Sequence, residues 1–129
     1  MTADPVFIRL GDPVSDARKM LSKHGVGHLP VVDGSRPVGM VSSSDLLRLI
    51  FDAGNGEPEV SDALLDMDFS IGQVMSSDLV SVASDQSVRH TATLMREADV
   101  HSAVVVDDDG ELAGIVTVTD LLGLLLDLL

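Results

Sequence analysis

Cysteine, tryptophan and tyrosine are absent from this chain of 129 residues, and phenylalanine occurs only three times. Without cysteine the chain has neither a disulfide framework nor a thiol nucleophile. The scarcity of aromatic rings leaves little from which to build the base-stacking platforms of single-strand nucleic-acid binders. Apolar residues still make up 45% of the chain, and the mean hydropathy is +0.30. We therefore expect one compact domain with an aliphatic core, built from two small halves.

Basic residues are also scarce. Two lysines and six arginines stand against 17 aspartates and four glutamates, which gives a net charge of −13 and a pI of about 4.3. The broad basic face that polyanion binding requires is therefore excluded, and we expect no nucleic-acid partner. A solvated acidic surface explains the charge more simply than adaptation to high salt, because net charge alone says little about function.

Long apolar runs are missing as well. The longest, LLGLLLDLL at residues 121–129, is much shorter than the roughly 20 residues that span a bilayer. The N-terminus lacks the basic segment and the apolar segment of a secretory signal peptide. The sequence therefore predicts a cytoplasmic protein without a membrane partner.

Motifs of catalysis and metal binding are equally absent. The chain has no G-x-S-x-G, no P-loop and no paired acid and base. Its four histidines have neither zinc-site spacing nor cysteine partners. The run DDDG at residues 107–110 lacks the alternating ligands and the closing glutamate of an EF-hand, and it is typical of a hairpin turn. We therefore expect no enzyme activity, no required cofactor and no metal site.

The chain does contain a repeated phrase. GMVSSSD at residues 39–45 returns as GIVTVTD at 114–120, and Leu-Leu follows both. Aligning residue 1 with residue 75, with one extra residue in the second copy after residue 107, extends the match over residues 1–50 with 14 identities. The chain is therefore two copies of one unit.

Each copy shows the same succession of elements. Short strands are predicted at residues 6–10 and 80–84, and each precedes a helix with apolar residues at helical spacing. Asp12 is the expected N-cap of the first helix, followed by Pro13 at its first position. Two β-rich runs around a turn then predict a hairpin, and a second helix follows SSSD or TVTD. The predicted order is β-α-β-β-α, twice.

This succession sets the domain organisation. We place the first repeat at residues 1–51 and the second at 73–129. Residues 52–72 between them form a linker, because DAGNGEP at its start is typical of a loop. Within the linker, residues 60–67 can form a short helix.

The repeated phrase has two interpretations. Ser42 can cap a helix while Asp45 reaches back to the N–H of the cap residue, and Thr117 with Asp120 repeats this spacing. Such a cap needs no ligand, stabilises by about 1 kcal/mol and is the more common origin of the pattern. A strand that runs into a helix N-terminus also favours anions, and a hydroxyl with a carboxylate can bind phosphate and ribose. Both roles can coexist at one site.

The chain resembles a tandem pair of CBS domains, the cystathionine β-synthase type of regulatory repeat, also called a Bateman module. The resemblance covers nearly the whole chain. It rests on MTADPV and MSSDLV at the start of the copies, on GHLPVVD and HSAVVVD in their middle, and on the closing G-h-h-[ST]-x-x-D of both. It implies an α+β fold of two pseudo-symmetric β-α-β-β-α units packed sheet to sheet, with α/β-type repeats and two equivalent clefts.

The resemblance also implies a function for the repeated phrase. Clefts of this family often bind adenosine compounds, namely AMP, ADP, ATP or S-adenosylmethionine. Asp45 and Asp120 would then hold the ribose hydroxyls. The other site residues that the resemblance implies are Ser42, Ser44, Thr117 and Thr119 near ribose or phosphate, His28 and His101 near phosphate, and Ile8 and Val82 against adenine.

The sequence departs from the family pattern in its charge. Where the family often has His or Arg, each copy keeps one basic-type residue, His28 or His101, and an unperturbed histidine is mostly neutral at pH 7. The negative field of the chain opposes anionic ligands. AMP or a cationic adenosine compound therefore suits the clefts better than ATP, and a polyphosphate would need Mg²⁺ or high salt. The alternative for His28 is the start of a capped strand without a ligand.

The C-terminal tract at residues 121–129 predicts association. Seven leucines in nine positions make a helix apolar nearly all round, whereas one face is enough to cover its own sheet. The remaining apolar surface requires the opposite repeat or a partner. In the family such helices join modules into flat dimers, and we therefore expect a homodimer.

Together these expectations predict a stand-alone regulatory module. It binds an adenosine ligand, dimerises and signals to an effector protein that the sequence does not identify. The alternative is a non-enzymatic docking or dimerisation module whose ligand clefts are vestigial.

Overall fold

The computed structural model describes residues 2–53 and 61–129. Its contacts divide the chain into two units, one around each repeat. The repeat-1 unit comprises Val6–Gly34 and Val38–Ser77, and the repeat-2 unit comprises Met1–Pro5, Ser35–Pro37 and Asp78–Leu129. Short segments of each repeat therefore belong to the unit that is built around the other one.

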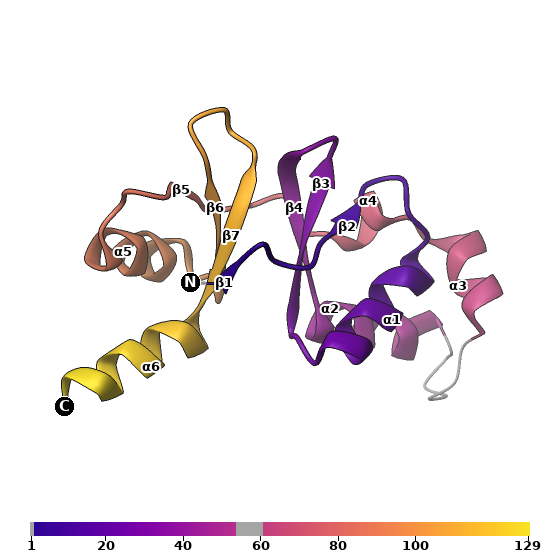
Figure 1. Ribbon diagram of the computed structural model, residues 1–129. Helices are drawn as coiled ribbons and strands as arrows, with labels where there is room; N and C mark the ends of the chain where they lie inside the picture. Colours follow the sequence, from indigo (N-terminus) through magenta and orange to yellow (C-terminus); the bar gives the residue numbers. More distant parts are fainter. Residues whose placement is uncertain (1, 54–60) are drawn as a thin grey trace. The chain divides into compact units, whose positions relative to one another are not determined.

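A three-stranded sheet in the order β2-β3-β4 forms the centre of the repeat-1 unit, and β2 runs parallel to β3. Helices α1 and α3 lie on the same side of this sheet and contact each other (Figure 1). The elements in chain order are β2 (Ile8–Arg9), α1 (Val14–His24), β3 (His28–Asp33), β4 (Arg36–Ser42), α2 (Ser43–Ala53), α3 (Asp62–Asp68) and α4 (Ile71–Val74).

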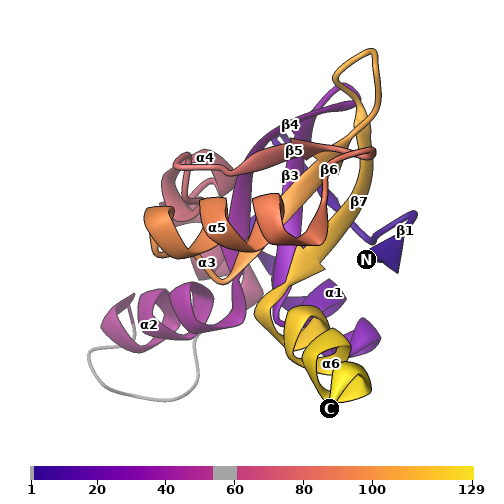
Figure 2. The ribbon, with the colours of Figure 1, turned by 90° about the vertical axis from the view of Figure 1, so that its left-hand side faces the viewer.

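The repeat-2 unit has a four-stranded sheet in the order β1-β7-β6-β5, and Figure 2 shows α5 and α6 in front of it. Its elements are β1 (Thr2–Ala3), β5 (Ser81–Ala83), α5 (Val88–Ala98), β6 (Ser102–Val106), β7 (Leu112–Thr117) and α6 (Val118–Leu128). The predicted order β-α-β-β-α is confirmed in both repeats, although their first strands are shorter than the sequence predicts.

The residues that open each repeat pair with the sheet of the other repeat. Thr2 of β1 pairs with Ile115 of β7, and Ser76 forms the equivalent antiparallel bridge with Met40 of β4. Gly39 permits the second approach, because a Cβ there would lie 2.9 Å from the carbonyl oxygen of Ser76. The glycine of the repeated phrase in repeat 1 thus makes room for the backbone of Ser76 and not for a ligand.

The core of the repeat-1 unit is aliphatic, as the composition predicts. Its buried side chains come from the sheet, from α1 and α2, and also from α3 and α4. Leu65 of α3 and Ile71 of α4 are both 0% exposed. Burying a side chain of this size stabilises a fold by about 1.5–3 kcal/mol. Much of the predicted linker is therefore a structural part of this unit.

Helix α1 begins differently from the sequence prediction. Its N-cap is Pro13, which supplies no side-chain hydrogen bond, whereas Asp12 accepts the N–H of Arg9 at 3.0 Å. The carboxylate of Asp66 in α3 instead accepts the N–H of Ser15 at 2.8 Å and its hydroxyl at 2.6 Å. These hydrogen bonds from Ser15 lower the pKa of the Asp66 carboxyl. Asp12 is thus wrong as the predicted cap, because a carboxylate 51 residues from Ser15 takes that role.

Ion pairs add to the contact between α1 and α3. Arg18 forms a hydrogen-bonded pair with Asp62, and Lys19 Nζ lies 3.8 Å from Oδ2 of the same carboxylate. All three side chains are partly exposed, so each pair contributes at most about 1 kcal/mol. The pairs therefore orient α3, and the burial of Leu65 provides most of the stability of the contact.

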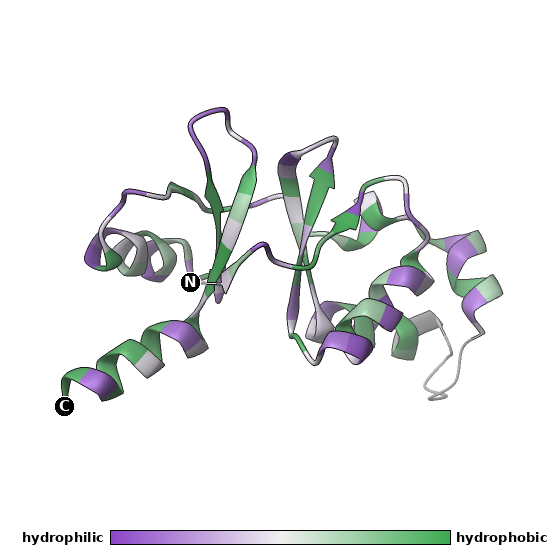
Figure 3. Ribbon diagram, viewed as in Figure 1, coloured by the Kyte–Doolittle hydropathy of each residue, from purple (hydrophilic) through white to green (hydrophobic). Residues whose placement is uncertain are grey.

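Helix α6 differs from its counterpart α2 in burial. Leu46 and Ile50 of α2 are 3% and 7% exposed, whereas no residue of α6 is buried. Figure 3 shows most of α6 as hydrophobic, with hydrophilic residues in its first turn and near its C-terminal end. Among the described residues, no helix combines the length and the hydrophobicity that crossing a membrane requires.

Replacing Asp66 with Asn tests the cap that α3 supplies to α1. At neutral pH we expect the variant to unfold at a lower urea concentration, because a charged hydrogen-bond acceptor is lost. Folding lowers the pKa of Asp66, so its contribution is fully present above the unfolded value of about 3.9 and is lost as the pH falls through the folded value. The difference in free energy of unfolding between Asp66→Asn and the native chain should therefore vanish in strong acid.

Asp68→Asn is the matched control, because Asp68 is exposed on the same helix. Its urea midpoint should equal that of the native chain. A destabilisation of Asp66→Asn that persists unchanged in strong acid would contradict the assigned role of the Asp66 charge.

Candidate functional site

The repeated phrase caps a helix in both repeats. In repeat 2 the hydroxyl of Thr117 accepts the N–H of Asp120 at 3.2 Å, and Asp120 Oδ2 accepts the N–H of Thr117 at 3.0 Å. In repeat 1 the hydroxyl of Ser42 accepts the N–H of Asp45 at 3.1 Å. The capping interpretation is therefore confirmed in full in repeat 2, whereas in repeat 1 the hydroxyl half of the cap is present and the Asp45 carboxylate does not bond the N–H of Ser42. Within the described residues, Asp120 Oδ1 is left without a hydrogen-bond partner.

The two aspartates of the phrase differ in their electrostatic surroundings. Asp45 Oδ1 lies 3.6 Å from Nη1 of Arg48, three residues further along α2. The counterpart of Arg48 in repeat 2 is Gly123, and Asp120 has no ion pair within residues 2–53 and 61–129. The carboxylate of repeat 2 is therefore the more available of the two to a hydroxyl group of a ligand.

Backbone hydrogen bonds hold the predicted phosphate-facing positions beside the two helix starts. The carbonyl oxygen of Gly27 accepts the N–H of Ser43 at 2.9 Å, and that of His101 accepts the N–H of Val118 at 3.0 Å. His101 is exposed, whereas His28 is half-buried at the first residue of β3. In repeat 2 the structure thus brings His101 next to the capped turn.

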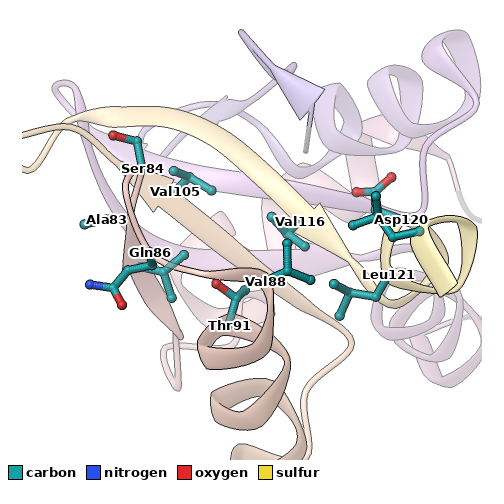
Figure 4. Close-up of a pocket in the computed structure, with 11 residues that line it drawn as sticks. Ala83, Ser84, Gln86, Val88, Thr91, Val105, Val116, Asp120 and Leu121 are labelled. Carbon is teal, nitrogen blue, oxygen red and sulfur yellow. The ribbon is translucent and has the colours of Figure 1, made fainter. Parts of the chain in front are cut away.

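A cavity of about 150 Å³ opens beside Asp120 in the repeat-2 unit. Val82, Val105 and Val116 line it from the sheet, and Leu121 and Leu124 line it from α6. Its wall also includes Val88 and Thr91 of α5 and the polar residues Ser84 and Gln86. In Figure 4 Asp120 and Leu121 lie at one end of the labelled side chains, and Ala83 and Ser84 lie at the other. The cavity is therefore mainly apolar, with a carboxylate at one end.

Two of the predicted site residues, Val82 and Asp120, line this cavity. Ile8, the counterpart of Val82, is 1% exposed and packs in the core of the repeat-1 unit. Ser44 and Thr119 are exposed in the first turns of α2 and α6. Of the predicted residues of repeat 2, Val82 and Asp120 thus line the cavity, whereas Thr117 and His101 bond the start of α6 and are not part of the cavity wall.

Sequence reasoning missed several residues of the cavity wall. Ser84 and Gln86 follow the short strand β5, and residues after a strand often carry function. Thr91 and Leu124 belong to helical patterns that predict only a packed core. No sequence signal separates a filled core position from one that borders a cavity, because both require the same apolar spacing.

The aspartate run in the second repeat forms a turn, as predicted. Asp107 Oδ1 accepts the N–H groups of Asp109 and Glu111, both at 3.0 Å, between β6 and β7. In the part of the chain that the structure describes, no three His, Asp or Glu side chains are grouped so that they could hold a metal ion.

Comparison with known proteins adds a family match. A family model described as "CBS domain" matches residues 1–52 and 71–127. An inosine-5′-monophosphate dehydrogenase of Korarchaeum cryptofilum is 28% identical over 117 residues, which are 91% of this chain and 21% of that protein. An uncharacterized protein of Methanocaldococcus jannaschii is 31% identical over 135 residues, which cover 99% of this chain and 31% of that protein.

Solved structures show the same fold. The structure of CBSX2 in complex with AMP is 27% identical, has a TM-score of 0.78, and the match covers 99% of this chain and 93% of that one. The CBS domain pair of protein MJ0100, in complex with 5′-methylthioadenosine and S-adenosyl-L-methionine, is 27% identical with a TM-score of 0.75. That match covers 96% of this chain and 94% of the domain pair. The chain spans between 21% and 55% of the length of the first curated relatives it matches.

A matched pair of substitutions tests the cavity. Val82→Ile adds one methylene at the cavity wall, and we expect it to raise the free energy of unfolding by about 0.8 kcal/mol. Ile8→Val removes a methylene from the filled counterpart and should cost about 0.5–1.5 kcal/mol. Urea unfolding of both variants gives these values. A destabilised Val82→Ile would mean that the position is already filled in solution.

Proposed function

Because the chain belongs to the CBS domain family, we propose that it is a regulatory module that binds an adenosine ligand and signals to a partner protein. The observation that supports this most directly is the cavity beside Asp120, whose Oδ1 is without a partner in the described residues. The two similar structures that hold AMP, or 5′-methylthioadenosine with S-adenosylmethionine, support the class of ligand. The module performs no reaction in this proposal.

The size of the cavity suggests how the ligand lies. Pockets that hold a whole small molecule measure about 300–1,000 Å³, so a cavity of about 150 Å³ takes one end of it. The adenine ring matches the apolar wall formed by Val82, Val105 and Val116. The ribose hydroxyls then donate to Asp120 Oδ1 while Oδ2 keeps its bond to the N–H of Thr117.

The charges around the cavity affect which charged groups the rest of the ligand can carry. The N–H of Thr119 in the first turn of α6 has no partner in the described residues, and a helix N-terminus favours an anion. The net charge of −13 opposes a polyphosphate at long range. We therefore propose AMP or the cationic S-adenosylmethionine as ligand in preference to ADP or ATP, which would bind together with Mg²⁺.

A second candidate function is docking or dimerisation without a ligand. The exposed leucines of α6 favour it: Leu122 and Leu126 are 54% and 70% exposed. With 3.6 residues per turn, these two leucines lie on a different face of α6 from Leu121 and Leu124, which line the cavity. We propose that this outer face joins two copies of the chain into a homodimer, which is compatible with a ligand in the cavity.

Thermal unfolding with adenosine compounds tests the ligand. At 100 times its dissociation constant, a ligand adds about 2.7 kcal/mol to the free energy of unfolding, and we expect AMP or S-adenosylmethionine to raise Tm accordingly. Asp120→Ala should abolish this shift. Asp45→Ala, which loses only the exposed ion pair with Arg48, should retain it. An unchanged Tm with AMP, ADP, ATP and S-adenosylmethionine, with or without Mg²⁺, would favour the second candidate.

Sedimentation of a single variant tests the dimer. Leu126→Glu places a charge on the outer face of α6 and should give a monomer, because burying an unpaired carboxylate in an interface is costly. Leu64→Glu, at a 55% exposed leucine of α3, is the control and should sediment as the native chain does. A native chain that is monomeric at the highest concentration would refute the dimer.

A further inference from the structure

The cavity of the repeat-2 unit corresponds to a filled region of the repeat-1 unit. When the repeats are aligned, the cavity residues correspond to repeat-1 residues that are mostly buried in the core. Val82, Val105 and Val116 correspond to Ile8, Val31 and Val41, and the helical residues Val88, Thr91 and Leu121 correspond to Val14, Ala17 and Leu46. Equivalent positions therefore form a filled core in repeat 1 and the wall of a cavity in repeat 2.

Helices α3 and α4 close the scaffold in repeat 1. Leu65 and Ile71 are 0% exposed within the cluster that holds Val14, which is itself 0% exposed. The counterpart of Val14 is Val88, and it is 55% exposed. The described residues of the repeat-2 unit include no helix equivalent to α3. The open groove of repeat 2 therefore corresponds to the surface that α3 and α4 cover in repeat 1.

A polar contact accompanies the apolar one. In repeat 1 the carboxylate of Asp66, next to Leu65, accepts hydrogen bonds from the N–H and the hydroxyl of Ser15. The counterpart of Ser15 is Arg89, which is exposed at the same position of α5. In the described residues neither the guanidinium nor the N–H of Arg89 has a partner. Arg89 thus offers a carboxylate at least as many donors as Ser15 does, with a positive charge in addition.

We propose that this groove, lined by Val82, Val88, Thr91, Leu121 and Leu124, docks an amphipathic helix of a partner protein, with Arg89 directly after Val88 on α5. The helix presents a leucine followed directly by an aspartate, as α3 presents Leu65 and Asp66. Its leucine enters the cavity, and its carboxylate binds Arg89. The positive charge of Arg89 attracts an acidic segment of the partner, although the net charge of the whole chain is negative.

The docked leucine and the adenosine ligand would use the same cavity. Ligand binding would therefore release the partner helix. The partner protein would in this way respond to whether the cavity holds a ligand. The docking itself does not depend on the ligand, whereas this competition rests on the proposed function.

Fluorescence anisotropy with the chain's own segment as probe tests the docking. The probe is a labelled peptide of residues 61–75, which contains the Leu-Asp pair of α3. We expect saturable 1:1 binding to the full chain, because the linked α3 already occupies repeat 1 at high effective concentration. Arg89→Glu should weaken binding at least tenfold, and a peptide with Asp66→Arg should restore it. Lys23→Glu, the same charge change at an exposed residue of α1, should bind as the native chain does.

Three results would overturn the proposal. They are the absence of saturable binding, an equal loss in Lys23→Glu and Arg89→Glu, and binding that appears only in the monomeric Leu126→Glu variant. The last would show that a second copy of the chain occupies the groove.

Adding AMP distinguishes the docking of the helix from the proposed competition between helix and ligand. If AMP raises Tm but leaves the peptide bound, the shared cavity is refuted and the docking stands; if AMP has no effect on Tm, the ligand fails and the docking is still decided by the peptide.

Discussion

The hydrogen bonds between the first turn of α1 and the carboxylate of Asp66 determine how the repeat-1 unit is completed. They place α3 so that Leu65 enters the core, and Ile71 of α4 follows it. The apolar contact provides most of the stability, and the charged contact provides the register, because a carboxylate accepts both donors of Ser15 only in one position. The repeat-2 unit, which has no such helix among its described residues, retains a cavity at the corresponding place.

The capping role of the repeated phrase is compatible with the binding role that we propose for it. The carboxylate of Asp120 bonds within its own turn through Oδ2, yet its Oδ1 remains available next to an apolar cavity. In repeat 1 the equivalent aspartate faces Arg48, and the equivalent cavity is core. The two repeats thus share one fold, and they differ in the side chains around the cavity of repeat 2 and the corresponding core of repeat 1.

Residue size contributes to this difference, in addition to the absence of a helix equivalent to α3 from the described residues of the repeat-2 unit. Repeat 1 has Ile8 and Leu29 where repeat 2 has Val82 and Ala103, and all four side chains are nearly or fully buried. Of the smaller pair, Val82 lines the cavity, where a larger side chain would fill part of the space. Because α6 buries none of its leucines, the helix layer of repeat 2 presents apolar surface both to the cavity and outward. The outer face therefore allows a second copy of the chain to bind at a position separate from the cavity, which the proposed ligand and the proposed partner helix would share.

Local pattern was enough to predict the element order, the duplication, the two caps and the family, because each depends on residues close together in the chain or on a repeated spacing. The repeated phrase also selected Asp120, and the family resemblance selected Val82; both line the cavity. Tertiary structure alone decided that Asp66 replaces Asp12 at the start of α1, that Gly39 accommodates Ser76, and that one repeat is filled while the other is open. These features depend on which distant segment occupies a given space, and sequence spacing carries no information about that.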